Sequence, residues 1–375
     1  MKIPSFGNYF RTILFSVSAI LTLIWAACSS SSPTPTPTPT PTVSPAALTV
    51  VLPADDAPHA DANTEWWYYN GHLTDAAGSK YGFHYAIFRV TVPGFPPVDI
   101  GQAAISDVQK GAYLQGQRLA IGGTPTSSQG FDFYVGNSIS GSPGAVPGNA
   151  SSDVWSMAGY GGSDTLAATL PGYAFNLALA SEKAPALHGG TGLVDFGVAG
   201  KSYYYSRTRM DVTGSITVGG KESKVTGLAW FDHQWGNFQP QDVGWDWFAL
   251  QLDDGTDVML SVLFGPNHKP LYNYGTVVTK DGQRQDLTAD HFRVQSTGSW
   301  TSPTTGIAYP SGWQVAIPKL GVDVAVTPLL LASEFDARQT TQNVYWEGDV
   351  AVSGTHTGVG YVELTGYGAT TAATR

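Results

Sequence analysis

The chain has 375 residues, a formal net charge of −10 and only 13% charged residues. A chain this acidic lacks the basic surface that nucleic acids and anionic lipid head groups attract, so neither is an expected partner. Glycine and aromatic residues are abundant, and no long segment has the 3.6-residue period of an amphipathic helix, so an all-β protein is predicted.

Residues 1–27 have the features of a bacterial lipoprotein signal peptide. Lys2 and Arg11 give a positive start, and an apolar run, Ile13–Trp25, follows. This run is short for a stable membrane span, and small residues precede Cys28, so we expect Cys28 to be lipidated. An ordinary cleaved signal peptide with an incidental cysteine is the alternative.

Residues 28–48 repeat proline with serine and threonine, and they contain little that could be buried in a core. Such a sequence favours polyproline II, so a semi-rigid stalk is predicted between a membrane and the folded part. Cys28 is the only cysteine, so no disulfide and no thiol nucleophile are expected. The predicted location is extracytoplasmic and membrane-anchored, in the periplasm or on the cell surface.

The rest of the chain exceeds what one core usually holds, so two domains are predicted, at 49–238 and 239–375. In the first, Glu65–Leu73 and Tyr81–Val90 are aromatic and β-branched and flank a polar turn, which predicts a hairpin. Glu65 and Trp67 are expected on one face of the first strand, and the even-numbered residues on the other.

Ser202–Met210 is a further predicted strand, on which residues alternate between two faces. One face is expected to carry the odd-numbered residues Tyr203, Tyr205, Arg207 and Arg209. Tyr204 then lies on the other face. We expect Arg207 to pair with Glu65 or Asp232 across a barrel mouth and to fix the polar end of a ligand. Solvated arginines on a packed strand are the alternative.

The stretch WFDHQWGNFQPQDVGWDWF, Trp230–Phe248, combines four tryptophans with carboxylates and one histidine. A carboxylic acid in an aromatic pocket has a raised pKa and can donate a proton, and aromatic faces stabilise a developing cation. On a strand, His233 and Trp235 share a face that Asp232 does not, unless a bulge intervenes. A capping carboxylate at Asp232 and a satisfied, buried His233 are the alternatives.

The second domain begins with another predicted hairpin, Trp245–Leu252 and Asp257–Phe264, joined at an Asp-Gly turn. A repeat relates the two halves, because the segments beginning at Gly214 and Gly348 both read G-x-[IV]-x-V-x-G-x-x-x-x-V. Each half is therefore expected to end in the same hairpin, although a chance match between two glycine-turn hairpins is the alternative.

Several catalytic motifs are absent from the sequence. It contains no G-x-S-x-G and no H-E-x-x-H, and its eight histidines have no short metal-ligand spacing. Standard triad hydrolysis, nucleotide chemistry and metal catalysis are therefore not expected, and neither a metal nor a cofactor is predicted.

Six segments occur in an order that resembles a known family. They are EWWYYNGHL, ALHGGTG, SYYYSRTRM, GLAWFDHQWG, WDWFALQLDDG and YWEGDVAVSG with the following GYVELTGY. Together they resemble the carotenoid 1,2-hydratases (hydroxyneurosporene synthases) and the related AttH-like proteins. The resemblance implies two lipocalin-like β-barrel domains packed together. It also implies cofactor-free hydration of a carotenoid or cyclisation of a polyene, although many AttH-like proteins have no assigned activity.

The resemblance places His233 and Trp235 at the H-x-W segment implicated in the hydratases. It also implies a Tyr-x-Asp pair on the strand after Trp245–Leu252, but the residues there, including Met259 and Ser261, supply no acid. The candidate acids that remain are Asp232, Asp246 and Glu65.

The sequence as a whole predicts a membrane-anchored, cofactor-independent enzyme that hydrates or cyclises a hydrophobic polyene or terpenoid by proton transfer. The predicted catalytic residues are Asp232, His233, Trp235 and Glu65. The predicted ligand-binding residues are Trp67, Tyr204, Tyr205, Arg207, Trp230 and Trp245. A non-catalytic lipocalin-like carrier or sensor for a hydrophobic ligand is the alternative.

Overall fold

The computed structural model describes residues 49–123, 129–136, 154–196, 200–238 and 243–368. The predicted signal peptide, Cys28 and the stalk lie outside the described residues. Within the described ranges the regular elements are strands and short 3-10 turns, and the strands form two antiparallel sheets. No helix in this part of the chain is long and apolar enough to cross a membrane.

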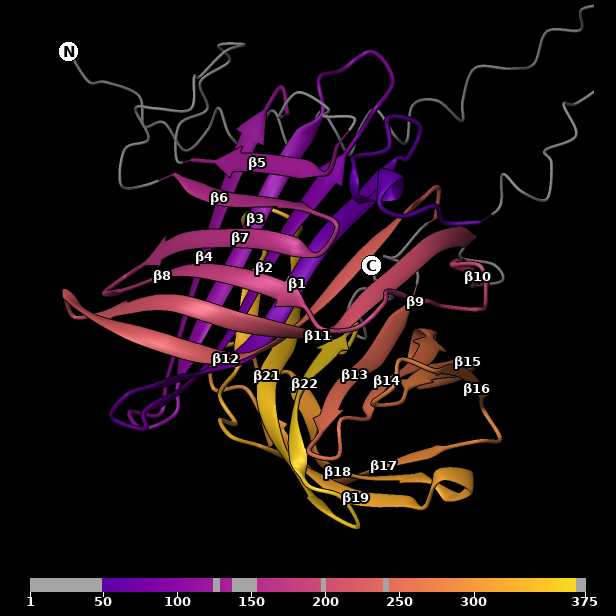
Figure 1. Cartoon of the computed structure of the whole chain (residues 1–375). Coiled ribbons are helices and arrows are strands. Elements are labelled where there is room, and N and C mark those ends of the chain that lie inside the picture. The colour runs from indigo at the N-terminus through magenta and orange to yellow at the C-terminus, as the bar shows by residue number, and fades with distance from the viewer. Residues whose placement is uncertain (1–48, 124–128, 137–153, 197–199, 239–242, 369–375) are drawn as a thin grey trace, which may run out of the picture. The chain divides into compact units, whose positions relative to one another are not determined.

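The first sheet contains the strands before residue 240, in the order β4-β3-β2-β1-β12-β11-β8-β7-β6-β5, with β9 and β10 paired to β11 (Figure 1). Its strands are β1 (Thr64–Asp75), β2 (Lys80–Val90), β3 (Val98–Asp107), β4 (Ala112–Ile121), β5 (Phe131–Val135), β6 (Trp155–Tyr160), β7 (Ser163–Leu170), β8 (Tyr173–Ser181), β9 (Ala186–Leu187), β10 (Leu193–Asp195), β11 (Lys201–Val218) and β12 (Lys221–Gly236).

The second sheet contains the later strands, in the order β16-β15-β14-β13-β22-β21-β19-β18-β17, with β20 paired to β21. Its strands are β13 (Gly244–Leu252), β14 (Asp257–Gly265), β15 (Lys269–Val278), β16 (Arg284–Thr288), β17 (Arg293–Thr301), β18 (Ala308–Ile317), β19 (Val322–Pro328), β20 (Glu334–Ala337), β21 (Asn343–Gly354) and β22 (Gly358–Thr365). The 3-10 turns are η2 (Ala54–Asp56), η5 (Pro266–His268) and η6 (Pro318–Leu320).

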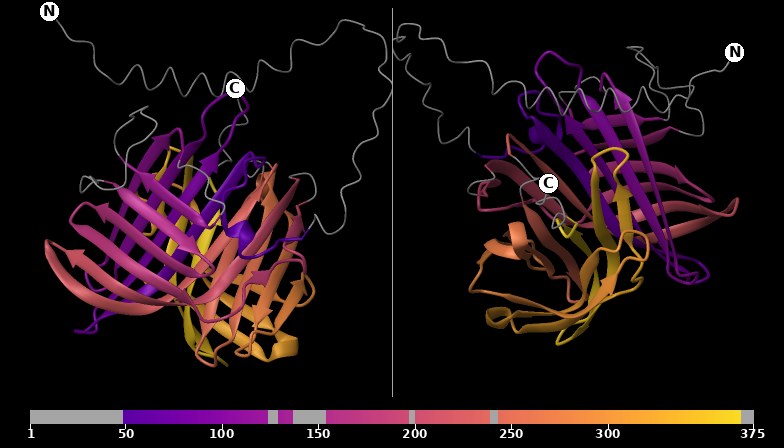
Figure 2. Two further views of the ribbon diagram at one scale, coloured as in Figure 1. Left: turned by 45° about the horizontal axis from the view of Figure 1, so that its top comes forward. Right: turned by 180° about the vertical axis from the view of Figure 1, so that it is seen from behind.

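Both sheets are curved, as the two further views in Figure 2 show. Each encloses a hydrophobic core of its own. In the first sheet, strands β5 to β8 cross over the face of β1 to β4 (Figure 1), and a bridge from Leu119 in β4 to Gly136 after β5 joins the two ends. The predicted class, all-β with two antiparallel barrels in tandem, is confirmed.

The two sheets also share an internal order, which agrees with the sequence repeat. In the first, the hairpin β11–β12 carries the repeat that begins at Gly214, and β12 pairs with the first strand, β1. In the second, the hairpin β21–β22 carries the repeat that begins at Gly348, and β22 pairs with the first strand, β13. The prediction that both halves end in the same hairpin is confirmed.

Strand β1 is buried on both faces, and its alternation divides two environments. Trp67 and Tyr69 belong to the core inside the first barrel, as predicted for the odd-numbered face. Tyr68 points the other way, into a cluster that residues of the second sheet complete. We call this the inter-sheet cluster; its buried members are Tyr68, Ala86, Val194, Tyr204, Trp230, Trp247, Ala249, Met259, Leu263, Tyr274 and Tyr361.

A β-bulge in β11 overturns one prediction about the arginines. The register against β12 shifts between Arg207 and Met210, so that Thr208 and Arg209 occupy the place of one residue. Arg207 therefore points into the first barrel and pairs with Asp56, whereas Arg209 points out of it. The two arginines do not share a face, because the extra residue breaks the two-residue period.

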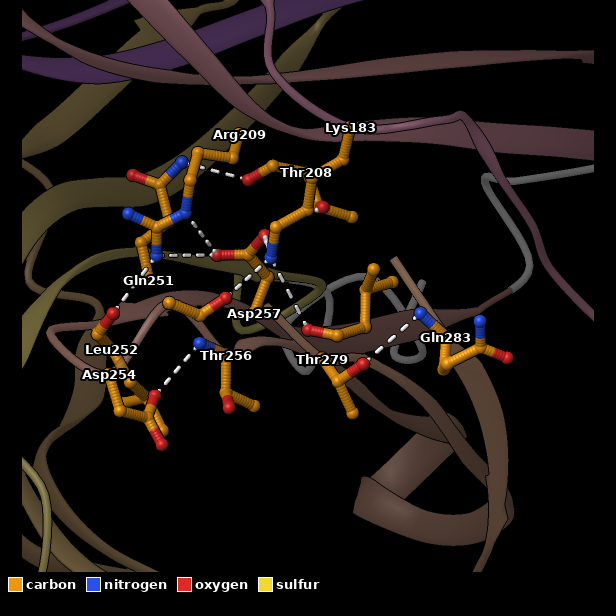
Figure 3. A network of polar contacts seen from close by, with 12 residues as sticks. Lys183, Thr208, Arg209, Gln251, Leu252, Asp254, Thr256, Asp257, Thr279 and Gln283 are labelled. Carbon is orange, nitrogen blue, oxygen red and sulfur yellow. Dashed lines mark hydrogen bonds and ion pairs between the residues drawn. The ribbon is translucent and has the colours of Figure 1, made fainter. Parts of the chain in front are cut away.

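Arg209 joins a network that links the first sheet to the second (Figure 3). Its guanidinium and the Lys183 ammonium both contact the carboxylate of Asp257, at 2.8 and 2.6 Å, and the Thr208 hydroxyl donates to the same carboxylate at 2.8 Å. Asp257 is completely buried and begins β14, directly after the predicted Asp-Gly turn. We call this network the Asp257 clamp.

Candidate active site

Strand β12 presents alternate residues to the two environments. Phe231, His233 and Trp235 point into the first barrel and belong to, or lie within, its aromatic core. Asp232 lies between them in sequence and points outward, to Tyr204 on the face that the inter-sheet cluster covers. The predicted alternation along this strand is therefore found, and the structure does not bring Asp232 to His233.

Inside the first barrel, His233 is joined to Glu65 and His59. Glu65 in β1 accepts from His233 Nε2 at 2.8 Å and from His59 Nδ1 at 2.7 Å, both through Oε1. Its second oxygen accepts the backbone N–H of His59 at 2.9 Å. Glu65 and His233 are buried, whereas His59 is 19% exposed and lies 3.6 Å from Asp55. We call His59, Glu65 and His233 the His-Glu-His cluster.

The charges in this cluster follow from burial and hydrogen bonding. Burial lowers the pKa of His59, but its hydrogen bonds to Asp55 and Glu65 outweigh burial and raise that pKa to about 9. Burial raises the pKa of Glu65, but the two histidines outweigh it and lower the pKa. Burial keeps the pKa of His233 below its usual value. At neutral pH the cluster is a protonated His59, an ionised Glu65 and a neutral His233.

His233 has one ring nitrogen without a partner. Because ionised Glu65 can only accept, Nε2 of His233 carries the proton, and Nδ1 keeps its lone pair. Nδ1 is buried and has no hydrogen-bond partner among the described residues. The rings of Trp67 and Trp235 lie 4.5 and 4.7 Å from the imidazole, and that of Tyr205 lies 5.4 Å away. A free base in an aromatic environment is the main chemical feature of this barrel.

A buried ion pair lies beside the cluster. Nη2 of Arg207 donates to both oxygens of Asp56, at 2.7 and 2.9 Å, and the Tyr205 hydroxyl donates to the same carboxylate. The prediction that Arg207 pairs with Glu65 or Asp232 is wrong. Asp56 reaches Arg207 because the turn η2 inserts into the barrel, where Trp67 Nε1 also holds it by its backbone carbonyl.

Asp232 is fully hydrogen-bonded on the outer face. Its Oδ1 accepts from Trp230 Nε1 at 2.7 Å and from the Ser206 hydroxyl, and its Oδ2 accepts from the Tyr204 hydroxyl at 2.6 Å. Burial raises the pKa of Asp232 to about 6, against the effect of these three donors. Because every oxygen is occupied, this carboxyl has a structural role in joining β11 to β12.

The predicted site residues thus fall into two groups. Glu65, Trp67, Tyr205, Arg207, His233 and Trp235 line the inside of the first barrel. Tyr204, Trp230, Asp232 and Trp245 lie in or against the inter-sheet cluster. The third candidate acid, Asp246, accepts from Tyr367 at 2.6 Å and joins neither group.

Sequence reasoning did not identify His59 and Asp56. Both lie in the segment before β1, which has no periodicity and no motif that marks them. The sequence also predicted no metal site, yet His59, Glu65 and His233 bring one ligand atom each to within 4.8 Å of one another. A spacing rule could not have found this set, since His59 and His233 are far apart in the chain.

Two cavities in the described residues lie elsewhere. One, of about 260 Å³, is lined by Asp253, Asp254 and residues 354–357 at two surface turns of the second barrel. The other, of about 290 Å³, lies over β7, β8 and β11 near Asn176 and Glu222. Neither touches the His-Glu-His cluster.

Comparison with known proteins places the chain within one family. The AttH-like family model matches residues 43–367. A protein from Nitrosomonas europaea that is assigned as AttH has a similar structure, with a TM-score of 0.74 and 28% identity over 85% of this chain and 97% of that one. No curated protein matches the sequence.

Two further structures share the fold alone. Kievitone hydratase from Nectria haematococca has a TM-score of 0.63 and 17% identity, over 84% of this chain and 93% of its own. CghA with Sch210972 has a TM-score of 0.53 and 11% identity, over 81% of this chain and 88% of its own. These likenesses agree with the two lipocalin-like barrels that the sequence predicts.

Proposed function

Since this chain belongs to the AttH-like family, we propose that it is a cofactor-independent enzyme that adds water to, or removes it from, a hydrophobic unsaturated substrate. The observation that carries this proposal is the free Nδ1 of His233, buried among aromatic rings while Glu65 holds Nε2. A carboxylate that orients a histidine and leaves its second nitrogen free is a common arrangement for a general base.

In the proposed reaction, His233 Nδ1 takes a proton from a water molecule as the water oxygen bonds to one alkene carbon. The same Nδ1 then returns that proton to the neighbouring carbon, so that H and OH are both added and His233 is restored. Glu65 stabilises the imidazolium that forms between the two steps. Dehydration is the reverse sequence.

The chemistry of the base narrows the substrate class. An isolated alkene needs a strong acid to start the reaction, and Asp232, the leading acid predicted from the sequence, points away from His233. A double bond conjugated to a carbonyl accepts water with the help of a base, because the negative charge spreads onto the carbonyl oxygen. We therefore favour a conjugated, mostly apolar substrate, with Trp67 and Trp235 packing against its apolar part.

Incubation with substrate panels tests this proposal. The purified chain is offered conjugated enones, acyclic carotenoids and other terpenoids, and products that differ by one water are sought by mass spectrometry. His233→Asn and Glu65→Gln should each lower the rate by about 10²- to 10⁴-fold, the usual contribution of a general base. His356→Asn, at a surface turn of the second barrel, is the matched control and should keep full activity.

The enzyme proposal would be contradicted if no panel member gave a product and native mass spectrometry showed a co-purifying apolar molecule. That result would favour the alternative function, a carrier or sensor. If only carotenoids were hydrated, and the rate were unchanged in His233→Asn, the active site would have to lie elsewhere and His233 would not be the base.

We also propose that the enzyme is tethered outside the cytoplasmic membrane by a lipid on Cys28, which would keep it close to a hydrophobic substrate. The support is the lipobox-like segment before Cys28 and the proline-rich stalk after it. In a bacterial host, metabolic labelling with a fatty acid should mark the wild type and spare Cys28→Ser, and the variant should leave the membrane fraction. Equal labelling of the two would contradict the anchor.

A further inference from the structure

The three side chains of the His-Glu-His cluster form a ligand set as well as a hydrogen-bonded chain. Each offers one nitrogen or oxygen atom, and these atoms lie within 4.8 Å of one another. Two imidazoles and one carboxylate are a set that divalent transition metals, Zn²⁺ in particular, take in proteins, with a fourth position left open. Tetrahedral bonds of about 2.0–2.1 Å separate neighbouring ligand atoms by roughly 3.3 Å. The present 2.7 and 2.8 Å contacts would therefore open only slightly.

The surroundings hold these side chains in place. Glu65 and His233 lie on β1 and β12, which are paired in register across this point. The His59 ring stacks on Trp235 at 4.0 Å, and the His233 ring stacks on Trp67 at 4.5 Å. Rings fixed in this way lose little freedom when they bind an ion.

Polar groups behind the ligand atoms add to this arrangement. The backbone N–H of His59 donates to Glu65 Oε2 at 2.9 Å, so Oε1 is left to face the two imidazoles. Asp55 lies 3.6 Å from His59 Nε2, on the side of the ring away from the cluster. A carboxylate behind a ligating histidine fixes the tautomer and raises the basicity of the metal-binding nitrogen.

Access and charge also suit a cation. His59 and Asp55 are 19% and 27% exposed, so an ion can approach past them to the buried Glu65. A bound cation replaces the proton that His59 carries at neutral pH. With both imidazoles then neutral, three carboxylates, those of Asp55, Asp56 and Glu65, outnumber one guanidinium, that of Arg207. The local charge is then negative, and a divalent cation offsets it.

We propose that His59, Glu65 and His233 bind one divalent transition-metal ion, and that this ion inhibits the enzyme. The metal displaces the Nε2 proton of His233, which passes to Nδ1, and the Nδ1 proton of His59, which passes to solvent. It then takes the Nε2 lone pair and the Glu65 oxygen, so His233 has no free lone pair left to act as a base. The inhibitory consequence rests on the proposed function, whereas the metal site itself does not.

Metal titration of the folded chain tests the site without any substrate. Zn²⁺ is titrated calorimetrically, and Co²⁺ is followed by its visible absorption, which reports tetrahedral nitrogen and oxygen ligands. One ion per chain is expected at micromolar concentration. His233→Ala and Glu65→Ala should weaken binding at least 100-fold. His59→Gln, at a partly exposed position, should weaken it at least 10-fold with an unchanged circular dichroism spectrum.

A matched control separates this site from surface histidines. His291→Gln alters a histidine that contacts Lys319 Nζ at 3.3 Å, and it should leave both titrations unchanged. The absence of stoichiometric binding would overturn the proposal, and so would binding that survives His59→Gln and His233→Ala.

Activity gives the second readout. If the enzyme is active, Zn²⁺ should inhibit it with the affinity found by titration, and a chelator should restore it. Activity that is lost in His233→Asn but insensitive to Zn²⁺ would leave the proposed function standing and overturn the inhibition. If the chain bound the metal but had no activity, the metal site would be supported and only the proposed function would be contradicted.

Discussion

Asp232 and His233 are adjacent on β12 and both are buried, but they differ in the hydrogen bonds they make. Asp232 accepts from Tyr204, Ser206 and Trp230, so both of its oxygens are occupied. His233 donates to Glu65 and keeps a second nitrogen with no partner among the described residues. A buried polar atom without a partner is costly, by about 1–3 kcal/mol, so its presence calls for an explanation, of which a role in binding or catalysis is one.

The raised pKa of Asp232 predicts a pH-dependent stability. Its pKa is about 6 in the folded chain, above the ordinary 3.8 of an aspartate, because burial disfavours the charged form. The folded state therefore holds the proton more tightly, and stability falls as pH rises from about 4 through 6 and then levels off. The loss from this one carboxyl is at most about 3 kcal/mol, at 1.36 kcal/mol per pKa unit.

Asp232→Asn removes this titration. The free energy of unfolding is measured in urea at pH 4, 5, 6 and 7. The variant should be less stable than the wild type at pH 4, and this difference in stability should narrow or reverse by pH 7. Parallel stability curves for the two proteins would mean that Asp232 stays ionised throughout, and they would contradict the pKa shift.

At the scale of single elements, the face on which a side chain lies was predictable wherever a strand keeps its two-residue period. The alternation in β1 separates Trp67 from Tyr68, and the alternation in β12 separates His233 from Asp232, as the sequence predicts. The period fails in β11, where a bulge sends Arg209 out of the barrel, and no local residue marks that bulge.

The rest of the site depends on contacts that local sequence does not encode. His59 and Asp56 come from an aperiodic segment. The His59 side chain bonds Glu65 and its ring lies 5.7 Å from that of His233, while Asp56 pairs with Arg207. A pattern of neighbours along the chain could therefore suggest His233 and Glu65 as candidates. It could not show that a third residue would join them, or which carboxylate would pair with Arg207.

At the scale of the whole molecule, the inter-sheet cluster and the Asp257 clamp connect the two sheets. Tyr68 and Trp230 from the first sheet pack with Trp247 and Tyr361 from the second. The outer faces of β1 and β12 are thus buried by the second sheet, which is why burial is nearly continuous along the middle of β1 and the second half of β12. The strands that carry Glu65 and His233 are supported from both sides.

The Asp257 clamp gives the last prediction. Asp257→Asn leaves the Lys183 ammonium and the Arg209 guanidinium, 6% and 12% exposed, without the carboxylate they share. Removal of one partner from a buried ion pair costs about 3–5 kcal/mol, because the remaining charges stay desolvated. Urea unfolding should show this loss in full. Asp286→Asn breaks a 2.6 Å pair with Arg284 whose side chains are 29% and 40% exposed, and it should cost at most about 1 kcal/mol.

The same variant tests whether the two sheets unfold together. Since the clamp and the inter-sheet cluster bind the first sheet to the second, Asp257→Asn should shift a single transition, seen alike by tryptophan fluorescence and by circular dichroism. If the clamp were a surface feature, Asp257→Asn and Asp286→Asn would have equal effects. If the two sheets unfolded independently, the variant would show two separate transitions. The second sheet would then not stabilise β1 and β12, the strands that carry Glu65 and His233.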